Sequence, residues 1–96
     1  MNNDNDWPDH LYGVLQEECA ELIQAISKRR RFGPWSMSPG GHRTNQQCIN
    51  DEINDVLAVV ELLARENERV HQDDTHQENK MRKVKLYYEG STGTRI

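Results

Sequence analysis

The chain has 96 residues, a formal net charge of −4 and 34% hydrophobic residues. This length corresponds to one domain. A hydrophobic content below the roughly 45–50% of average globular proteins predicts a thin core for a single copy. We therefore expect a homodimer or homotetramer, because small domains often bury more surface by oligomerising. The negative charge argues against a general nucleic-acid-binding surface.

Several features predict a cytoplasmic protein outside the membrane. The longest uninterrupted apolar run, from Val56 to Val60, is far shorter than the ~20 residues that a membrane span needs. The N-terminus is polar and acidic, which is unlike a secretion signal. Cys19 and Cys48 form no C-x-x-C motif and have apolar neighbours, which is typical of small buried residues in a reducing compartment.

The first segment, 1–7, is rich in asparagine and aspartate and is predicted to be flexible. A helix is then expected over 8–32. Pro8 suits the first helical turn, and Asp9 is favourable at the positive end of the helix dipole. The helix should end before Gly33-Pro34, where glycine can cap it and proline prevents its continuation.

An acidic cluster, Glu17-Glu18-Cys19-Ala20-Glu21, interrupts the apolar pattern of this first helix. At about 100° per residue, Glu18 lies in the middle of the apolar stripe, and Glu21 lies at its edge. A solvated charge run would instead face away from the apolar side chains. The apolar residues within about 60° of Glu18 are Leu11, Val14, Leu15, Leu22 and Ala25.

Residues 33–44 form a predicted loop rich in glycine, proline and serine, which also contains Trp35. A second helix is expected over 45–68, because Thr44-x-x-Gln47 has the form of a capping box. A second pair of carboxylates lies in this helix. Glu52 is central in the apolar stripe and Asp55 lies on its flank, whereas Glu61 lies opposite. The stripe around Glu52 contains Cys48, Ile49, Val56, Val59 and Leu63.

Burying four carboxylates against apolar side chains is costly unless they are paired, protonated or share a cation. Pairs of oxygen ligands at i and i+3 on two helices suit Mg²⁺, and Mn²⁺ is also possible. A single E-x-x-E motif is weak evidence, since such motifs are common on solvated helices. Two motifs that are both centred on apolar faces favour a metal site.

A third helix is expected over 75–88, opened by the capping box Thr75-x-x-Glu78. Its apolar stripe, formed by Met81, Val84 and Tyr88, is narrow and predicts a docked surface helix. Residues 90–96 form a polar tail that is predicted to be flexible. The expected fold is therefore all-α, with one domain over 8–89, in which a bundle of three main helices per chain is completed by oligomerisation.

The motifs Glu17-Glu18-x-x-Glu21 and Glu52-x-x-Asp55 resemble the signature of the all-α nucleoside triphosphate pyrophosphohydrolases. This group includes the MazG-like proteins, with their dCTP pyrophosphatase, dimeric dUTPase and phosphoribosyl-ATP pyrophosphatase relatives. The likeness extends from about Leu11 to Leu63. It implies a magnesium-dependent enzyme that cuts a nucleotide between its α and β phosphates. The stretch between the motifs is long for the short MazG-like members and closer to the dCTP pyrophosphatase kind.

The resemblance also implies roles for individual residues. The metal-binding positions of the family match Glu18, Glu21, Glu52 and Asp55. In metal-assisted hydrolysis, a carboxylate takes the proton of the attacking water. Glu17 or Glu21 could do so, and nothing in the sequence distinguishes between them.

Predicted substrate contacts lie outside the two motifs. Trp35 resembles the loop tryptophan that closes over the base in the dCTP pyrophosphatase relatives, although it could equally cover the end of the bundle. Arg31, within the run Lys28 to Arg31, could clamp the phosphate tail, or simply favour the helix C-terminus. Lys80 and Lys83 resemble the downstream basic residues that reach substrate phosphates in this family, although solvated lysines are the usual alternative.

Two other functions fit the sequence. The chain could be a non-catalytic helical interaction module, whose buried carboxylates pair with basic residues across an oligomer interface. It could also be an enzyme similar to phosphoribosyl-ATP pyrophosphatase, although the long Trp35 loop favours a triphosphatase that closes on a nucleobase. Stabilisation by magnesium would separate a metal-dependent enzyme from an ionic network.

Overall fold

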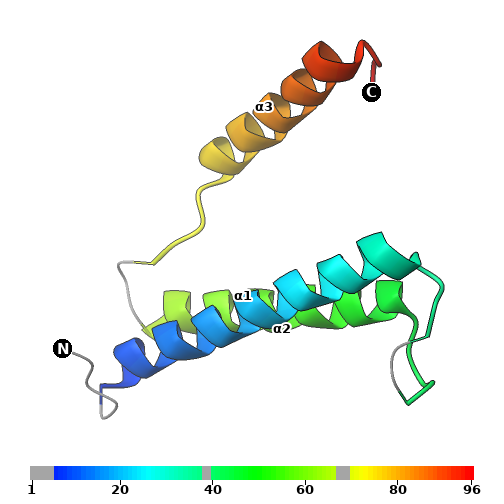
Figure 1. Ribbon diagram of the computed structural model, residues 1–96. Helices are drawn as coiled ribbons and strands as arrows, with labels where there is room; N and C mark the ends of the chain where they lie inside the picture. The colour runs from blue at the N-terminus through cyan, green and yellow to red at the C-terminus, as the bar shows by residue number, and fades with distance from the viewer. Residues whose placement is uncertain (1–5, 38–39, 67–69) are drawn as a thin grey trace.

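The computed structural model describes residues 6–37, 40–66 and 70–96. It contains three helices: α1 (Trp7–Phe32), α2 (Asn45–Glu66) and α3 (Asp74–Thr92) (Figure 1). The described residues contain no strand, only an isolated bridge between Met37 and Thr44. The all-α prediction is therefore confirmed. The expected flexibility of residues 1–5 and the expected helical residues 67–68 lie outside the described residues.

Local chemistry sets both ends of α1. The side chain of Asp6 caps the helix by accepting a hydrogen bond of 3.2 Å from the Asp9 N–H. Gly33 ends the helix with a φ of 88°, a conformation that favours glycine. Its N–H donates to the Arg29 carbonyl at 2.8 Å. These bounds agree with the predicted helix to within one residue.

The predicted capping box at the start of α2 is present. The Gln47 N–H donates to Thr44 Oγ1 at 3.1 Å, and the Thr44 N–H donates to Gln47 Oε1 at 2.9 Å. The first residues of α2 also hold the preceding loop. The Asn45 N–H donates to the Ser36 carbonyl at 2.8 Å, and the buried Asn45 side chain donates to the Gly33 carbonyl at 3.0 Å. The part of the loop from Gly33 to Ser36 is therefore held against the start of α2.

Helices α1 and α2 pack side by side in opposite directions and form a helical hairpin (Figure 1). Four hydrophobic side chains in the described residues are buried: Leu11 and Ala25 from α1, and Ile49 and Leu63 from α2. Leu63 is the most enclosed, with 1% of its surface exposed. The core is thin, as the composition predicts.

The third helix differs from its predicted bounds at both ends. Asp73, not Thr75, caps α3, because its carboxylate accepts a 2.9 Å hydrogen bond from the His76 N–H and Thr75 already lies inside the helix. The helix continues to Thr92, through residues expected in the flexible tail. It ends at Gly93, which adopts the left-handed conformation with a φ of 73°.

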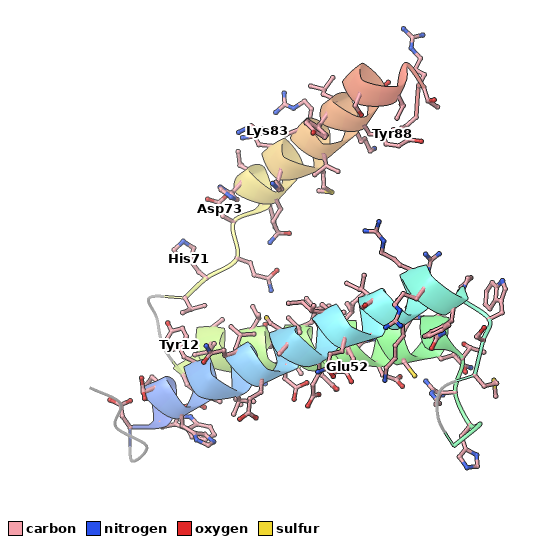
Figure 2. All side chains as sticks on the ribbon, viewed as in Figure 1. Tyr12, Glu52, His71, Asp73, Lys83 and Tyr88 are labelled. Carbon is pink, nitrogen blue, oxygen red and sulfur yellow. The ribbon has the colours of Figure 1, made fainter. Side chains whose placement is uncertain are left out.

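Helix α3 is not docked on the hairpin, contrary to the sequence prediction. In the described part of the chain it contacts neither α1 nor α2, and it has no buried residue. Figure 2 shows Lys83 and Tyr88 on this separate helix. In its described part, a single copy is therefore a two-helix hairpin and a separate third helix, and not a closed bundle. None of the helices in the described residues is long and apolar enough to cross a membrane.

Candidate metal centre

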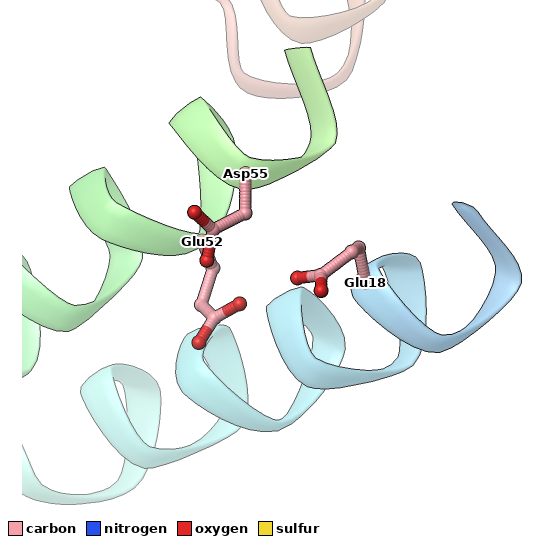
Figure 3. Close-up of side chains that lie close together, drawn as sticks. All are labelled: Glu18, Glu52 and Asp55. Atoms are coloured by element: carbon pink, nitrogen blue, oxygen red, sulfur yellow. The ribbon is translucent and has the colours of Figure 1, made fainter. Parts of the chain in front are cut away.

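Three carboxylates meet between α1 and α2. Glu18 comes from α1, and Glu52 and Asp55 come from α2; each offers an oxygen within 4.8 Å of the others (Figure 3). Glu18 and Glu52 are half-buried, and Asp55 is exposed. Oxygens from two helices are therefore close enough to bind one cation together.

The helical period explains why these side chains converge. The buried residues Leu11 and Ala25 lie about two turns before and after Glu18, and so on the same face of α1. Glu52 likewise shares a face of α2 with the buried Ile49, one turn earlier. Packing α1 on α2 through these apolar residues turns the two glutamates toward each other, and the axial register of the two helices brings their oxygens close together.

The electrostatics of the cluster are unfavourable without a cation. The Oε2 atoms of Glu18 and Glu52 are buried and have no hydrogen-bond partner. Burial is the main cause that raises the pKa of both glutamates, and repulsion from Glu21 and Asp55 raises it further. Carboxylate oxygens are ligands that Mg²⁺ and Mn²⁺ take in proteins, and a bound cation would pair with these two buried oxygens. The residues present therefore fit a hard divalent ion.

No basic side chain neutralises this cluster in the described residues. The salt bridges there join Arg43 to Asp51 at 2.8 Å and Arg65 to Glu61 at 3.0 Å, both at exposed positions. Neither pair includes a carboxylate of the candidate metal centre. The arrangement thus differs from an ionic network within one chain, in which cations would face the buried carboxylates.

The two candidate general bases lie in different places. Glu21 is outside the set of three, but it raises the pKa of both Glu18 and Glu52 and lines a cavity together with Glu52. Glu17 raises the pKa of Glu18 but not that of Glu52, and it lines a groove formed by α1 residues. Of these two candidate bases, Glu21 is therefore the one that interacts electrostatically with carboxylates of both helices.

A cavity of about 290 Å³ adjoins the carboxylates. Lys28 is the one basic residue in its lining, which also contains the acidic residues Glu21 and Glu52. In the sequence, Lys28 stands out only as part of the basic run Lys28 to Arg31. A stronger signal was available, since Lys28 lies about two turns after Glu21 on the same side of α1. The lining residues are Glu21, Gln24, Ala25, Lys28, Asn45, Cys48 and Glu52.

The other predicted substrate residues are more dispersed. The Arg31 guanidinium lies over the Phe32 ring, 5.1 Å from its centroid. Trp35 is 76% exposed and belongs to the loop held by α2. Lys80 and Lys83 line a separate groove on α3 together with a valine and a tyrosine. Within one chain, the structure does not bring these lysines to the carboxylates.

The model of the MazG nucleotide pyrophosphohydrolase domain matches residues 8–85, which is most of the chain. The chain belongs to this MazG family. The matched region contains α1, α2, most of α3 and all carboxylates of the candidate metal centre. Comparisons with curated proteins and with solved structures gave no match.

The raised pKa values predict an unusual pH dependence for the stability of this MazG domain. With metal chelated, the folded state binds protons on Glu18 and Glu52 more tightly than the unfolded state, whose carboxyls titrate near 4.5. The contribution of these two groups to the free energy of unfolding should therefore fall as pH rises above that value. The thermal midpoint, followed by circular dichroism, should decrease less steeply with pH in the variant Glu18→Gln/Glu52→Gln.

At neutral pH, magnesium should offset the destabilisation caused by the charged forms of Glu18 and Glu52, because an ion that binds only the folded state stabilises it. Adding Mg²⁺ should therefore raise the midpoint of the wild type but not that of the double variant. If the thermal midpoints of the wild type and the double variant depended equally on pH under chelation, the raised pKa values of Glu18 and Glu52 would be contradicted.

Proposed function

We propose that this MazG domain hydrolyses a nucleoside triphosphate between its α and β phosphates, giving a nucleoside monophosphate and pyrophosphate. The observation that carries the proposal is the pair of buried, unpartnered oxygens on Glu18 and Glu52, which lie beside a cavity lined also by Lys28. Membership of the MazG nucleotide pyrophosphohydrolase family supports the reaction class.

Glu18, Glu52 and Asp55 would hold the divalent ion, with Glu21 at the edge of the same site. When bound, Mg²⁺ would neutralise phosphate oxygens and make a neighbouring water more acidic. Without it, the substrate's negative phosphates would face several carboxylates. These residues therefore make binding of substrate and divalent ion mutually dependent.

Glu21 is the proposed general base. It lines the cavity with Glu52, whereas Glu17 lines the α1 groove. In the proposed step, Glu21 takes a proton from water, and the water oxygen forms the new bond to the α phosphorus of the nucleotide. The bond between phosphorus and the bridging oxygen breaks, and pyrophosphate leaves. One water is consumed for each nucleotide cleaved.

The cavity suggests how the nucleotide would be placed. Lys28 would bind oxygens of the phosphate tail, because it is the one cation in the lining. Asn45, in the same lining, also fixes the loop that carries Trp35. The exposed ring of Trp35 would then be available to stack on the nucleobase. This placement supports a nucleoside substrate and leaves the choice of base open.

Replacing Lys28 tests the phosphate contact. Lys28→Met keeps much of the aliphatic side chain but removes the charge, so KM for the nucleotide should rise about 10-fold or more. Arg31→Met is the matched control on the same helix, and its KM should change less, because Arg31 lies on the Phe32 ring and not in the cavity lining. Steady-state kinetics at saturating Mg²⁺ measure both. A larger effect of Arg31→Met would assign the phosphate contact to Arg31.

The decisive experiment measures pyrophosphate release from a panel of canonical and modified ribo- and deoxyribonucleoside triphosphates and phosphoribosyl-ATP. Each substrate is tested with Mg²⁺, with Mn²⁺ and with chelator. Metal-dependent release of pyrophosphate supports the proposal, and the best substrate defines the pocket. Release of inorganic phosphate would show that a different bond is cut. No turnover, together with no stabilisation by Mg²⁺, would favour the non-catalytic interaction module.

A further inference from the structure

The ion pair between Arg43 and Asp51 lies near both the cavity and the candidate metal centre. Arg43 comes shortly before α2, and Asp51 lies in the second turn of that helix. Asp51 is rotated by about 40° from Asp55, a residue of the metal centre, and by about 60° from Cys48, which lines the cavity. Along the helix axis it is about 6 Å from Asp55 and about 4.5 Å from Cys48. The pair therefore borders both parts of the candidate site.

The geometry of the pair determines how the guanidinium of Arg43 is presented. Arg43 Nε donates to Asp51 Oδ2 at 3.2 Å, and Arg43 Nη2 donates to Asp51 Oδ1 at 2.8 Å. Asp51 thus holds one edge of the planar group. A guanidinium has five N–H donors in a rigid fork, and within the described residues the Arg43 side chain makes no other hydrogen bond. The edge formed by its two terminal nitrogens is therefore oriented and able to bind the oxygens of a phosphate.

Stability gives little reason for an arginine at this position. Arg43 immediately precedes Thr44, which caps α2, so its charge lies at the positive end of the helix dipole, where a cation is unfavourable. The first turn of α2 contains no acidic residue that would offset this charge. The side chains of Arg43 and Asp51 are 46% and 54% exposed, and exposed ion pairs contribute little to stability. A role in binding an anion explains the position of Arg43 better.

We propose that Arg43, held in place by Asp51, binds the β and γ phosphates of the nucleotide, which leave together as pyrophosphate. This inference rests on the proposed function and adds a contact from the α2 side of the cavity. Because Lys28 lines the cavity from α1, cations from both sides would flank the phosphate tail. Arg43 would also stabilise the negative charge that develops on the leaving group as the bond breaks. This contact favours a nucleoside triphosphate over a diphosphate, which lacks the γ phosphate.

Two substitutions separate phosphate binding from a purely structural ion pair. Arg43→Met and Asp51→Asn break the same pair, so a structural role would make their effects equal. If Arg43 binds phosphate, only Arg43→Met removes the contact, whereas Asp51→Asn keeps the cation and takes away a neighbouring negative charge. Arg65→Met is the matched control, because it breaks the exposed pair with Glu61 on the face of α2 away from Glu52.

Isothermal titration calorimetry of the full chain with inorganic pyrophosphate, in the presence of Mg²⁺, measures this contact without turnover. Arg43→Met should weaken the binding of pyrophosphate about 10-fold or more, because it removes hydrogen bonds between charged groups. Asp51→Asn and Arg65→Met should each change the affinity by less than about threefold. In steady-state kinetics, the ratio of kcat/KM for a triphosphate to that for the matching diphosphate should fall in Arg43→Met and stay unchanged in Arg65→Met.

Equal losses of affinity in Arg43→Met and Asp51→Asn would show that the pair is only a structural contact and would overturn the proposal. Pyrophosphate binding that Arg43→Met leaves unchanged, or a wild type that binds no pyrophosphate, would overturn it as well. All three variants should keep the helical content of the wild type in circular dichroism, because the two pairs are exposed. The two proposals fail separately, since the substrate panel tests the reaction, whereas calorimetry detects the Arg43 contact even in a chain that cleaves no nucleotide.

Discussion

Glu52→Gln is expected to lower the magnesium-dependent release of pyrophosphate at least about 100-fold, a larger loss than supporting residues of a metal site usually cause. The amide keeps the size and shape of the side chain but removes the charge that would bind the ion. Because an oxygen of Glu52 lies within 4.8 Å of oxygens of Glu18 and Asp55, loss of its charge would leave the metal with an incomplete set of ligands. Glu18→Gln should have a similar effect for the same reason.

The thermal stability of Glu52→Gln without metal should rise, although its activity should fall. Burial and neighbouring carboxylates raise the pKa of Glu52, so its charged form is unfavourable in the folded protein without metal. Removing that charge should leave the helical content unchanged and raise the thermal midpoint under chelation. An inactive variant that is at least as stable as the wild type cannot owe its inactivity to unfolding. Circular dichroism with and without Mg²⁺ measures both properties.

Glu61→Gln is the matched control for this experiment. It makes the same chemical change on the same helix, but Glu61 lies on the opposite face and pairs with Arg65 at 3.0 Å in an exposed position. Exposed pairs of this kind contribute little to stability. Activity close to that of the wild type is therefore expected. Turnover that survives in both Glu18→Gln and Glu52→Gln would contradict the assignment of these residues to the metal.

Leu63→Ala should have the largest effect on stability. Leu63 is 1% exposed and is one of four hydrophobic residues that are buried in the described part of the chain. Removing its side chain loses burial and leaves a cavity, which costs about 2–5 kcal/mol in protein cores. The hairpin that contains this core extends only from Trp7 to Glu66, and a single core of that size rarely supplies more than about 3–5 kcal/mol. The variant should therefore be largely unfolded near physiological temperature.

Urea denaturation at one fixed protein concentration measures this loss, with Leu86→Ala as the control. Leu86→Ala is the same substitution on α3, at a position where 60% of the leucine surface is exposed. Its effect should be within about 0.5 kcal/mol. Equal denaturation midpoints for the two variants would show that the packing of α1 on α2 is not the main source of stability.

Local sequence determined the end of α1 and the start of α2. Thr44 and Gln47 exchange the hydrogen bonds that the capping box predicts, and Gly33 ends α1 where the sequence places the break. The sequence also placed Glu18 and Glu52 on apolar faces, because the angle of a residue around its own helix depends only on the helical period. The family resemblance rested on these same residues and is confirmed.

Tertiary structure decided what those angles could not. It places Asp55 within the set of three carboxylates and Glu21 at the cavity edge, and it puts Lys28, not Arg31, in the cavity lining. It also leaves α3 away from the hairpin, although the sequence predicted that this helix would dock. The physical reason is the same in each case. The helical period fixes direction around one axis, whereas the distance between side chains on different helices depends on which helices pack together and in which axial register.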